Sequence, residues 1–364
     1  MASKGGRVQR DPISAAELNL GVPLVDIGVN LLSRQFGKDA LEVIERSRVA
    51  GVSTLVLTAC SLRDARGLQD EFVSHGEVHG VRLVQTVGVH PHNAKQWSDE
   101  TRKDLRSLLR LPGVAAVGEC GLDYDRNFSP PELQRKCFRD QVDIANESGL
   151  PLLLHVRGPP GAEEECYRDF VEILKAKETD VRACVHCFTG SAEQAKLLLS
   201  KIPDLYFGIT GWICDERRGG EDLALVARDV IPRNRMMIET DAPFLLPRLQ
   251  HKALKGRRRN EPAFLPLIAE KLAQTMKVSA QDLALLTTSN ARRFFSLDAP
   301  PRCQEHQPQQ KGSLKQEGVK SLEDSQQQES KEGRESLTLE RGEDPGPLCS
   351  ATAAEGQTVG PGSE

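Results

Sequence analysis

The sequence predicts an α/β protein, and within that class an eight-stranded (β/α)8 TIM barrel followed by a disordered C-terminal tail. Short apolar runs alternate with longer amphipathic stretches over about 270 residues. The apolar runs are nearly continuous, as in parallel strands that are covered on both faces. Eight such runs occur, which fits a closed barrel better than an open sheet.

The predicted strands share a high content of Leu, Val and Ile. They span residues 24–30, 54–59, 83–89, 115–119, 151–156, 183–188, 205–210 and 236–240. Apolar residues at helical spacing predict helices between them, for example over 39–49, 132–146, 192–199 and 222–230. A doubly wound open sheet is the alternative. It would place a Gly-rich phosphate turn after the first strand, where this chain has Gly28-Val29-Asn30-Leu31 instead.

The two ends of the chain differ in composition from the middle. Residues 299–364 contain no Phe, Trp, Tyr, Ile or Met and are rich in Gln, Glu, Ser and Gly. Such a segment buries too little apolar surface to offset its ordering entropy. We therefore expect a flexible N-terminus over 1–20, a barrel over 21–298 and a disordered tail over 299–364.

The charge of the chain is unevenly distributed. The whole chain has 48 Lys and Arg, 52 Asp and Glu, and a net charge of −4. The tail holds 7 basic and 12 acidic residues, which leaves 41 basic and 40 acidic residues for positions 1–298. A body so close to neutral can contact nucleic acid only through a local basic patch.

Three features of the sequence concern its cellular compartment. No apolar run approaches the length of a membrane helix, and the N-terminus lacks the apolar segment of a secretory signal. The nine cysteines are scattered, which predicts free thiols and a cytoplasmic location, with the nucleus as the alternative. Cys184 and Cys187 form an isolated CxxC inside a predicted strand, and we expect both to be packing residues.

Polar residues with metal-ligand chemistry follow several predicted strands. Of the seven histidines in the body, His90, His92, His155 and His186 fall at such positions. Glu119 and Asp241 follow two other strands. Because the carboxyl ends of barrel strands meet at one mouth, we expect Glu119, His155, His186 and Asp241 to converge. Two imidazoles and two carboxylates suit Zn²⁺, Mn²⁺ or, with waters, Mg²⁺.

Seven blocks of sequence, spread over residues 24–295, together resemble the TatD family of metal-dependent deoxyribonucleases, a branch of the metal-dependent hydrolase superfamily. The resemblance implies a barrel that hydrolyses phosphodiesters, typically as a 3′–5′ exonuclease on single-stranded DNA or RNA ends. It also implies a divalent metal, with Mg²⁺ as first choice and Mn²⁺ or Zn²⁺ as alternatives. The blocks are Val25–Leu31, Gly88–His92, Gly118–Asp123, His186–Gly190, Gly208–Trp212, Glu239–Pro243 and Arg259–Pro262.

The resemblance also implies roles for single residues. The metal ligands of the family fall on Glu119, His155, His186 and Asp241, and we take Glu119 and Asp241 as catalytic, Asp241 also accepting a proton from the attacking water. We expect His90, His92 and Arg157 to bind or orient the phosphate. Two alternatives stay open: His92 as a surface histidine and Arg157 as a structural ion-pair residue.

The first strand departs from the wider superfamily. Most members have His-x-His at its end, where this chain has Gly28 and Asn30. A second metal would lose both imidazoles here. Two other functions stay open beside the nuclease. One is hydrolysis of another ester or amide on the same barrel, although such hydrolases usually need the His pair that is missing here. The other is a non-catalytic binding protein, although all four residues of metal-ligand type are present. The sequence specifies no protein partner.

The densest positive segment lies after the last predicted strand. Residues 251–259 read HKALKGRRR, with five Lys and Arg and no acidic residue. A solvated basic loop is the simplest interpretation. A barrel, however, places this loop near the active-site rim, so we expect Lys255, Arg257 and Arg258 to bind the substrate backbone.

Overall fold

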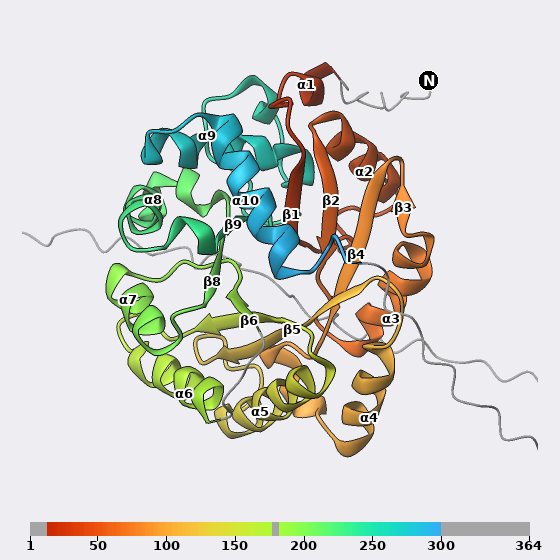
Figure 1. Ribbon diagram of the computed structural model, residues 1–364, viewed down its shortest axis with the longest axis vertical. Coiled ribbons are helices and arrows are strands. Elements are labelled where there is room, and N and C mark those ends of the chain that lie inside the picture. Colours follow the sequence, from red (N-terminus) through yellow and green to blue (C-terminus); the bar gives the residue numbers. More distant parts are fainter. Residues whose placement is uncertain (1–12, 177–181, 300–364) are drawn as a thin grey trace, which may run out of the picture. The chain divides into compact units, whose positions relative to one another are not determined.

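Eight parallel strands form a barrel in the computed structural model, which describes residues 13–176 and 182–299 (Figure 1). Neighbouring strands pair in chain order, so each strand lies beside the next one along the sequence. This confirms the predicted (β/α)8 class and excludes the doubly wound alternative. The eight strands are β1 (Leu24–Val29), β2 (Val52–Leu57), β4 (Val81–Val87), β5 (Val114–Asp123), β6 (Leu152–Arg157), β7 (Ala183–Val185), β8 (Tyr206–Ile209) and β9 (Met236–Ile238).

The first and last strands meet at their carboxyl ends. A parallel bridge joins Val29 to Ala242, and the Asn30 amide donates to the Ala242 carbonyl at 2.8 Å. The Asp241 amide donates to the Gly28 carbonyl at 2.9 Å. These bonds close the barrel at the end where we expect the site. One short extra strand, β3 (Glu77–Val78), pairs antiparallel with β4 outside the barrel order.

Helices connect the strands and surround them, as Figure 1 shows. Several begin at a side-chain cap; for example, the Ser191 side chain and Gln194 form a capping box. The helices are α1 (Ile13–Ala16), α2 (Ala40–Val49), α3 (Leu62–Glu71), α4 (Asp99–Leu108), α5 (Pro131–Ser148), α6 (Glu164–Lys175), α7 (Ala192–Lys201), α8 (Gly220–Asp229), α9 (Leu265–Met276) and α10 (Ala280–Phe294).

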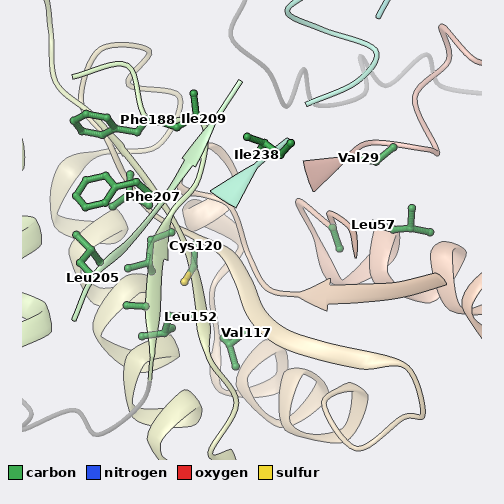
Figure 2. Close-up of a cluster of buried hydrophobic side chains, with 14 of the residues drawn as sticks. Val29, Leu57, Val117, Cys120, Leu152, Phe188, Leu205, Phe207, Ile209 and Ile238 are labelled. Carbon is green, nitrogen blue, oxygen red and sulfur yellow. The ribbon is translucent and has the colours of Figure 1, made fainter. Parts of the chain in front are cut away.

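Alternate strand residues divide the core into two layers, because side chains in a strand alternate between its faces. Residues on one face form a cluster inside the barrel together with the end of α10. This helix end closes the barrel at the amino-terminal ends of the strands. Residues on the other face pack against the helices, and Figure 2 shows part of this layer around Phe188, Phe207 and Ile238. The inner cluster comprises Val25, Ile27, Val56, Val84, Ala115, Ala116, Leu153, Cys184, Tyr206, Met237, Ala291, Phe294, Phe295 and Leu297.

The last residues of the body are tied to the base of the barrel. The Arg182 guanidinium donates to the Phe294 carbonyl at 3.0 Å and to Ser296 at 2.8 Å. Arg82 donates to the Leu297 carbonyl. The Phe294 ring lies 5.0 Å from the Tyr206 ring, centroid to centroid. The end of α10 is therefore part of the core.

The N-terminal expectation was too broad. The predicted loose segment of residues 1–20 lies outside the described residues only as far as residue 12; α1 follows, and Ala15 and Leu18 are buried against Ala253 and Leu254. The tail predicted over 299–364 lies outside the described residues from 300 onward. Within the described chain, no helix has both the length and the apolar character that crossing a membrane requires.

Among the cysteines that the structure describes, the predictions of free thiols and of packing roles for Cys184 and Cys187 hold with two exceptions. Cys120, Cys137, Cys166, Cys184, Cys187 and Cys214 are free thiols, but Cys60 takes part in a disulfide bond. Cys184 packs inside the barrel as expected. Cys187 does not, because β7 ends at Val185; it is half-buried and lies at the pocket described below.

The closure of the barrel base gives a stability prediction. We expect Phe294→Ala to lower the free energy of unfolding by about 3–5 kcal/mol, since it removes a fully buried ring and leaves a cavity. Urea denaturation followed by circular dichroism measures this change. Leu285→Ala on the same helix is the control, because Leu285 is 49% exposed. Equal effects of the two substitutions would contradict the role of Phe294.

Candidate active site

A polar pocket opens at the carboxyl ends of the strands. Its walls combine histidines, carboxylates and one arginine, the residue types that the sequence placed at strand ends. All four predicted metal ligands lie in it, as do three of the six predicted substrate-binding residues. The pocket is lined by Asn30, His90, His92, Glu119, His155, Val156, Arg157, His186, Cys187, Thr189 and Asp241.

The period of two along a strand places several of these side chains. Leu153, Cys184 and Met237 point into the barrel, so the positions two residues later, His155, His186 and Glu239, point inward one layer closer to the mouth. A polar layer of side chains therefore lies next to the mouth of the barrel, and the apolar layer lies beneath it.

Glycines make room for Glu239 in the polar layer. A Cβ at Gly28 or at Gly208 would collide with its carboxylate oxygens. Gly28 is one of the two positions at which the sequence departs from the His-x-His of most superfamily members. In this chain, the space beside it belongs to a buried carboxylate.

One carboxylate oxygen stands at the centre of the site. Glu119 Oε1 lies 2.6 Å from His186 Nε2, 3.1 Å from His155 Nδ1 and 3.2 Å from His90 Nε2. Burial alone would raise the pKa of Glu119, but His186 and His90 hold it well below its usual range. Glu119 is therefore an ionised carboxylate in a buried position.

Each of two imidazoles has its other nitrogen against a second carboxylate. His155 Nε2 lies 3.1 Å from Asp123 Oδ2, and His186 Nδ1 lies 3.3 Å from Glu239 Oε2. Burial would lower the pKa of His186, but Glu119 and Glu239 hold it well above its usual range. A carboxylate behind an imidazole fixes the ring and its tautomer, as in the outer shell of many metal sites.

His90 is held as a donor to Glu119. Its Nδ1 accepts the backbone N–H of His92 at 3.1 Å, and burial lowers the pKa of His90 to about 4, so the ring is neutral near pH 7. A neutral ring that accepts at Nδ1 carries its proton on Nε2, the atom that faces Glu119. His90 therefore orients Glu119 rather than offering a free lone pair at Nε2.

Asp241 is positioned by the turn after β9. It has a φ of 52°, and Asn30 Nδ2 donates to its Oδ1 at 3.0 Å. The preceding Thr240 is fixed by Asp26, whose Oδ1 accepts the Thr240 amide at 2.9 Å. The pKa of Asp241 is raised to about 8, chiefly by burial and also by Glu239 and Glu119, against the lowering effects of His186 and of the Asn30 hydrogen bond.

The donor set fits a divalent cation. Possible ligand atoms of Glu119 and His155 lie within 4.8 Å of each other, in a group that also contains the His90 ring. His186 Nε2 shares the same Glu119 oxygen, and Asp241 lines the same pocket. Glu119, Asp123, Glu239 and Asp241 are buried here, so four carboxyl groups lie in or behind the pocket wall. Imidazole nitrogen and carboxylate oxygen are ordinary ligands of Zn²⁺, Mn²⁺ and, with waters, Mg²⁺.

The predicted phosphate-binding residues differ in their surroundings. His92 is buried, not a surface histidine: it is 7% exposed, and its Nε2 lies 2.9 Å from Asp123 Oδ2. Its Nδ1 meets no hydrogen-bond partner among the described residues. Arg157 is half-buried and lines the pocket at the end of β6.

The basic loop 251–259 does not reach the pocket. None of Lys255, Arg257 and Arg258 lines it. Lys255 and Arg258 are exposed, whereas Arg257 is half-buried and donates to the Ala253 carbonyl at 3.4 Å. The loop also contains structural cations: Lys252 pairs with Glu17, and Arg259 donates to Asp39 and stacks over Phe36. Only part of its charge is therefore available to a ligand.

Two residues of the site were not assigned a role from the sequence. Asp123 lies four residues beyond the predicted end of its strand, and Glu239 lies inside a predicted strand. The same signal applies to both: β5 continues to Asp123, and Glu239 follows the inward Met237 by two. Extending the alternation of the fourth predicted strand by two residue pairs, and applying it within the last predicted strand, would have placed them beside His155 and His186.

Comparison with known proteins identifies the family. The model of the family described as TatD related DNase matches residues 25–296. The chain belongs to the TatD family. This confirms the family predicted from the sequence blocks and identifies the chain as a nuclease of the hydrolase class.

The relatives match over the barrel. A protein of Rahnella sp., named 3′-5′ ssDNA/RNA exonuclease TatD, is 42% identical over 280 residues, which cover 76% of this chain and 99% of the relative. A protein of the same name from Erwinia tasmaniensis is 44% identical over 274 residues, which cover 75% of this chain and 100% of the relative.

Solved structures share the fold. An uncharacterized amidohydrolase of Saccharomyces cerevisiae has a TM-score of 0.64 and 23% identity, covering 75% of this chain and 99% of its own. The TatD homologue YJJV of Escherichia coli has a TM-score of 0.63 and 22% identity, and the match covers 76% of this chain and 98% of the homologue. At this identity, the likeness supports the barrel architecture alone.

The carboxylate behind His186 gives a prediction about metal affinity. In Glu239→Gln the amide cannot accept from both the Cys187 amide and His186 Nδ1, so we expect Mn²⁺ to bind about 10- to 100-fold more weakly. Isothermal titration calorimetry measures the affinity. Glu147→Gln on the exposed face of α5 is the matched control. An unchanged Mn²⁺ affinity in a folded Glu239→Gln protein would show that Glu239 only fills space.

Proposed function

We propose that this protein is a metal-dependent 3′–5′ exonuclease that removes nucleotides from single-stranded DNA or RNA ends. The observation that carries the proposal is the cluster around Glu119 Oε1, with His155 and His186 each held by a second carboxylate. The names of the relatives support the substrate and the direction of attack. We propose Mg²⁺ as the metal, with Mn²⁺ and Zn²⁺ as alternatives.

Each pocket residue has a role in this proposal. Glu119, His155, His186 and Asp241 would hold the cation, which lowers the pKa of bound water and neutralises charge on the phosphoryl oxygens. The Asp241 carboxylate accepts the proton of the attacking water. The His92 ring and the Arg157 guanidinium orient the phosphate from the pocket wall. His90 keeps Glu119 in place through its Nε2 proton.

A digestion of end-labelled strands tests the proposal. With Mg²⁺, a 5′-labelled single strand should shorten stepwise, and a 3′-labelled strand should release its label as a mononucleotide. A chelator should stop both reactions, and added Mg²⁺ should restore them. A circular single strand has no end and should stay intact. Cutting of the circle would overturn an exonuclease, and digestion in the presence of chelator would overturn the metal requirement.

The central carboxylate gives a prediction about the rate of cleavage. Glu119→Gln keeps the shape of the side chain but removes the charge that faces three imidazoles, so metal-dependent cleavage should fall by roughly 100-fold or more. The initial rate on the 5′-labelled strand measures the loss, and circular dichroism checks the fold. Glu147→Gln should retain full activity. Cleavage at the normal rate by Glu119→Gln would exclude it as a ligand.

The basic loop gives a prediction about substrate binding. We propose that Lys255, Arg257 and Arg258 contact the sugar-phosphate backbone of the nucleic acid away from the cleaved bond. Each phosphate neutralised on a single strand contributes a slope of about −0.7 to log affinity against log salt, so replacing all three by Ala should flatten that slope. Fluorescence anisotropy with a labelled strand in the Glu119→Gln background measures it.

A charge-matched control separates this loop from the net charge of the protein. Lys175, Lys201 and Arg233 are exposed and precede β7, β8 and β9, at the opposite end of the barrel. Their replacement by Ala should leave the salt slope unchanged. If the loop variant gives the same slope as this control, the loop is a solvated surface without a contact to the strand.

A further inference from the structure

An aromatic ring lies exposed next to the pocket. Phe128 follows β5 and is 55% exposed, although an exposed phenyl ring is unfavourable in water. The other large hydrophobic side chains that are exposed in the described part of the chain are leucines: Leu41, Leu133, Leu197 and Leu285. Phe128 is thus the one aromatic residue among the exposed large hydrophobic residues of the described chain, and it has no role in the mechanism proposed above.

The loop that carries Phe128 is held in place at both ends. Gln134 accepts the Asp123 amide at 2.7 Å and donates to the Asp123 and Ser129 carbonyls at 2.9 and 2.7 Å. Ser129 Oγ donates to the His92 carbonyl at 2.9 Å. The ring is therefore presented on a fixed support, which lowers the entropy lost when a ligand binds to it.

Phe128 forms the outer end of a row of rings that leads into the site. Its centroid lies 4.7 Å from that of His92, and the two rings are nearly perpendicular at 85°. His92 lies 4.2 Å from His90, which lies 4.7 Å from His155. A group stacked on Phe128 would thus lie next to the residues that we assign to phosphate and metal.

We propose that Phe128 stacks on the base of a nucleotide next to the cleaved phosphodiester, and that this contact selects single strands. The proposal rests on the exonuclease function proposed above. An unpaired base can turn its face to a ring, whereas a base inside a duplex is stacked between its neighbours. His92 Nδ1, buried and without a hydrogen-bond partner among the described residues, lies beside the same ring and offers the nucleotide a polar contact.

The test is a kinetic comparison of single strands that each lack one base. An abasic residue is placed at the first, second or third position from the 3′ end, and kcat and KM are measured with Mg²⁺. In the native protein, loss of the base at one of these positions should raise KM by about 5- to 100-fold with little change in kcat. In Phe128→Ala, KM should rise by the same factor on the complete strand, and the same abasic position should add nothing further.

Three further variants separate stacking from other effects. Phe128→Trp should restore the low KM, because it keeps an aromatic face. Phe128→Leu should not, although it keeps an apolar side chain of similar size. Leu285→Ala, which removes a similarly exposed side chain on α10, should leave KM unchanged.

Each outcome decides the proposal. If Phe128→Ala cleaves the complete strand with normal KM, stacking is overturned and the proposed exonuclease stands. If Phe128→Ala loses activity by one factor on complete and abasic strands alike, Phe128 only supports His92, and stacking is again overturned. If the native protein cleaves no single strand with any of the three metals, the proposed function itself fails.

Discussion

The mouth of the barrel depends on one buried carboxylate, Glu119. A carboxylate loses its hydration on burial, so it stays ionised only where donors or cations surround it. Three imidazole nitrogens within 3.2 Å of Glu119 Oε1 supply this environment. The two imidazoles His155 and His186 in turn contact carboxylates of their own, Asp123 and Glu239, on their other ring nitrogens. The site is a connected network and not four separate ligands.

The network has an electrostatic consequence for a nuclease. The pocket gathers carboxylates where a phosphodiester would bind, and a phosphodiester is also negative. His186, with its pKa held well above its usual range, offsets part of that charge, whereas His90 is neutral near pH 7 and does not. A cation between the carboxylates and the phosphate would reduce their repulsion, so we expect metal binding to favour substrate binding as well as the chemistry.

The sequence predicted the parts of this structure that depend on local pattern. Continuous apolar runs predicted all eight barrel strands, and the rule that active sites lie at strand ends placed His155 and His186. It did not predict contacts between distant segments. The pairing of Lys252 with Glu17 and of Arg259 with Asp39, which occupies two cations of the basic loop, depends on tertiary packing that no local pattern contains. The space that Gly28 leaves for Glu239 is of the same kind.

The position of α10 bears on the order in which the chain folds. The helix packs against β1 and β9, and Thr288 Oγ1 donates to the Pro23 carbonyl at 3.0 Å, a contact between residues 265 positions apart. Strands β1 and β2, by contrast, are joined by a short helical connection. Contacts so distant in sequence carry a large loop-closure entropy, which neighbouring strand pairs avoid. Docking of α10 therefore carries a larger loop-closure cost than pairing β1 with β2, and it is this helix end that covers the apolar interior of the barrel at its base.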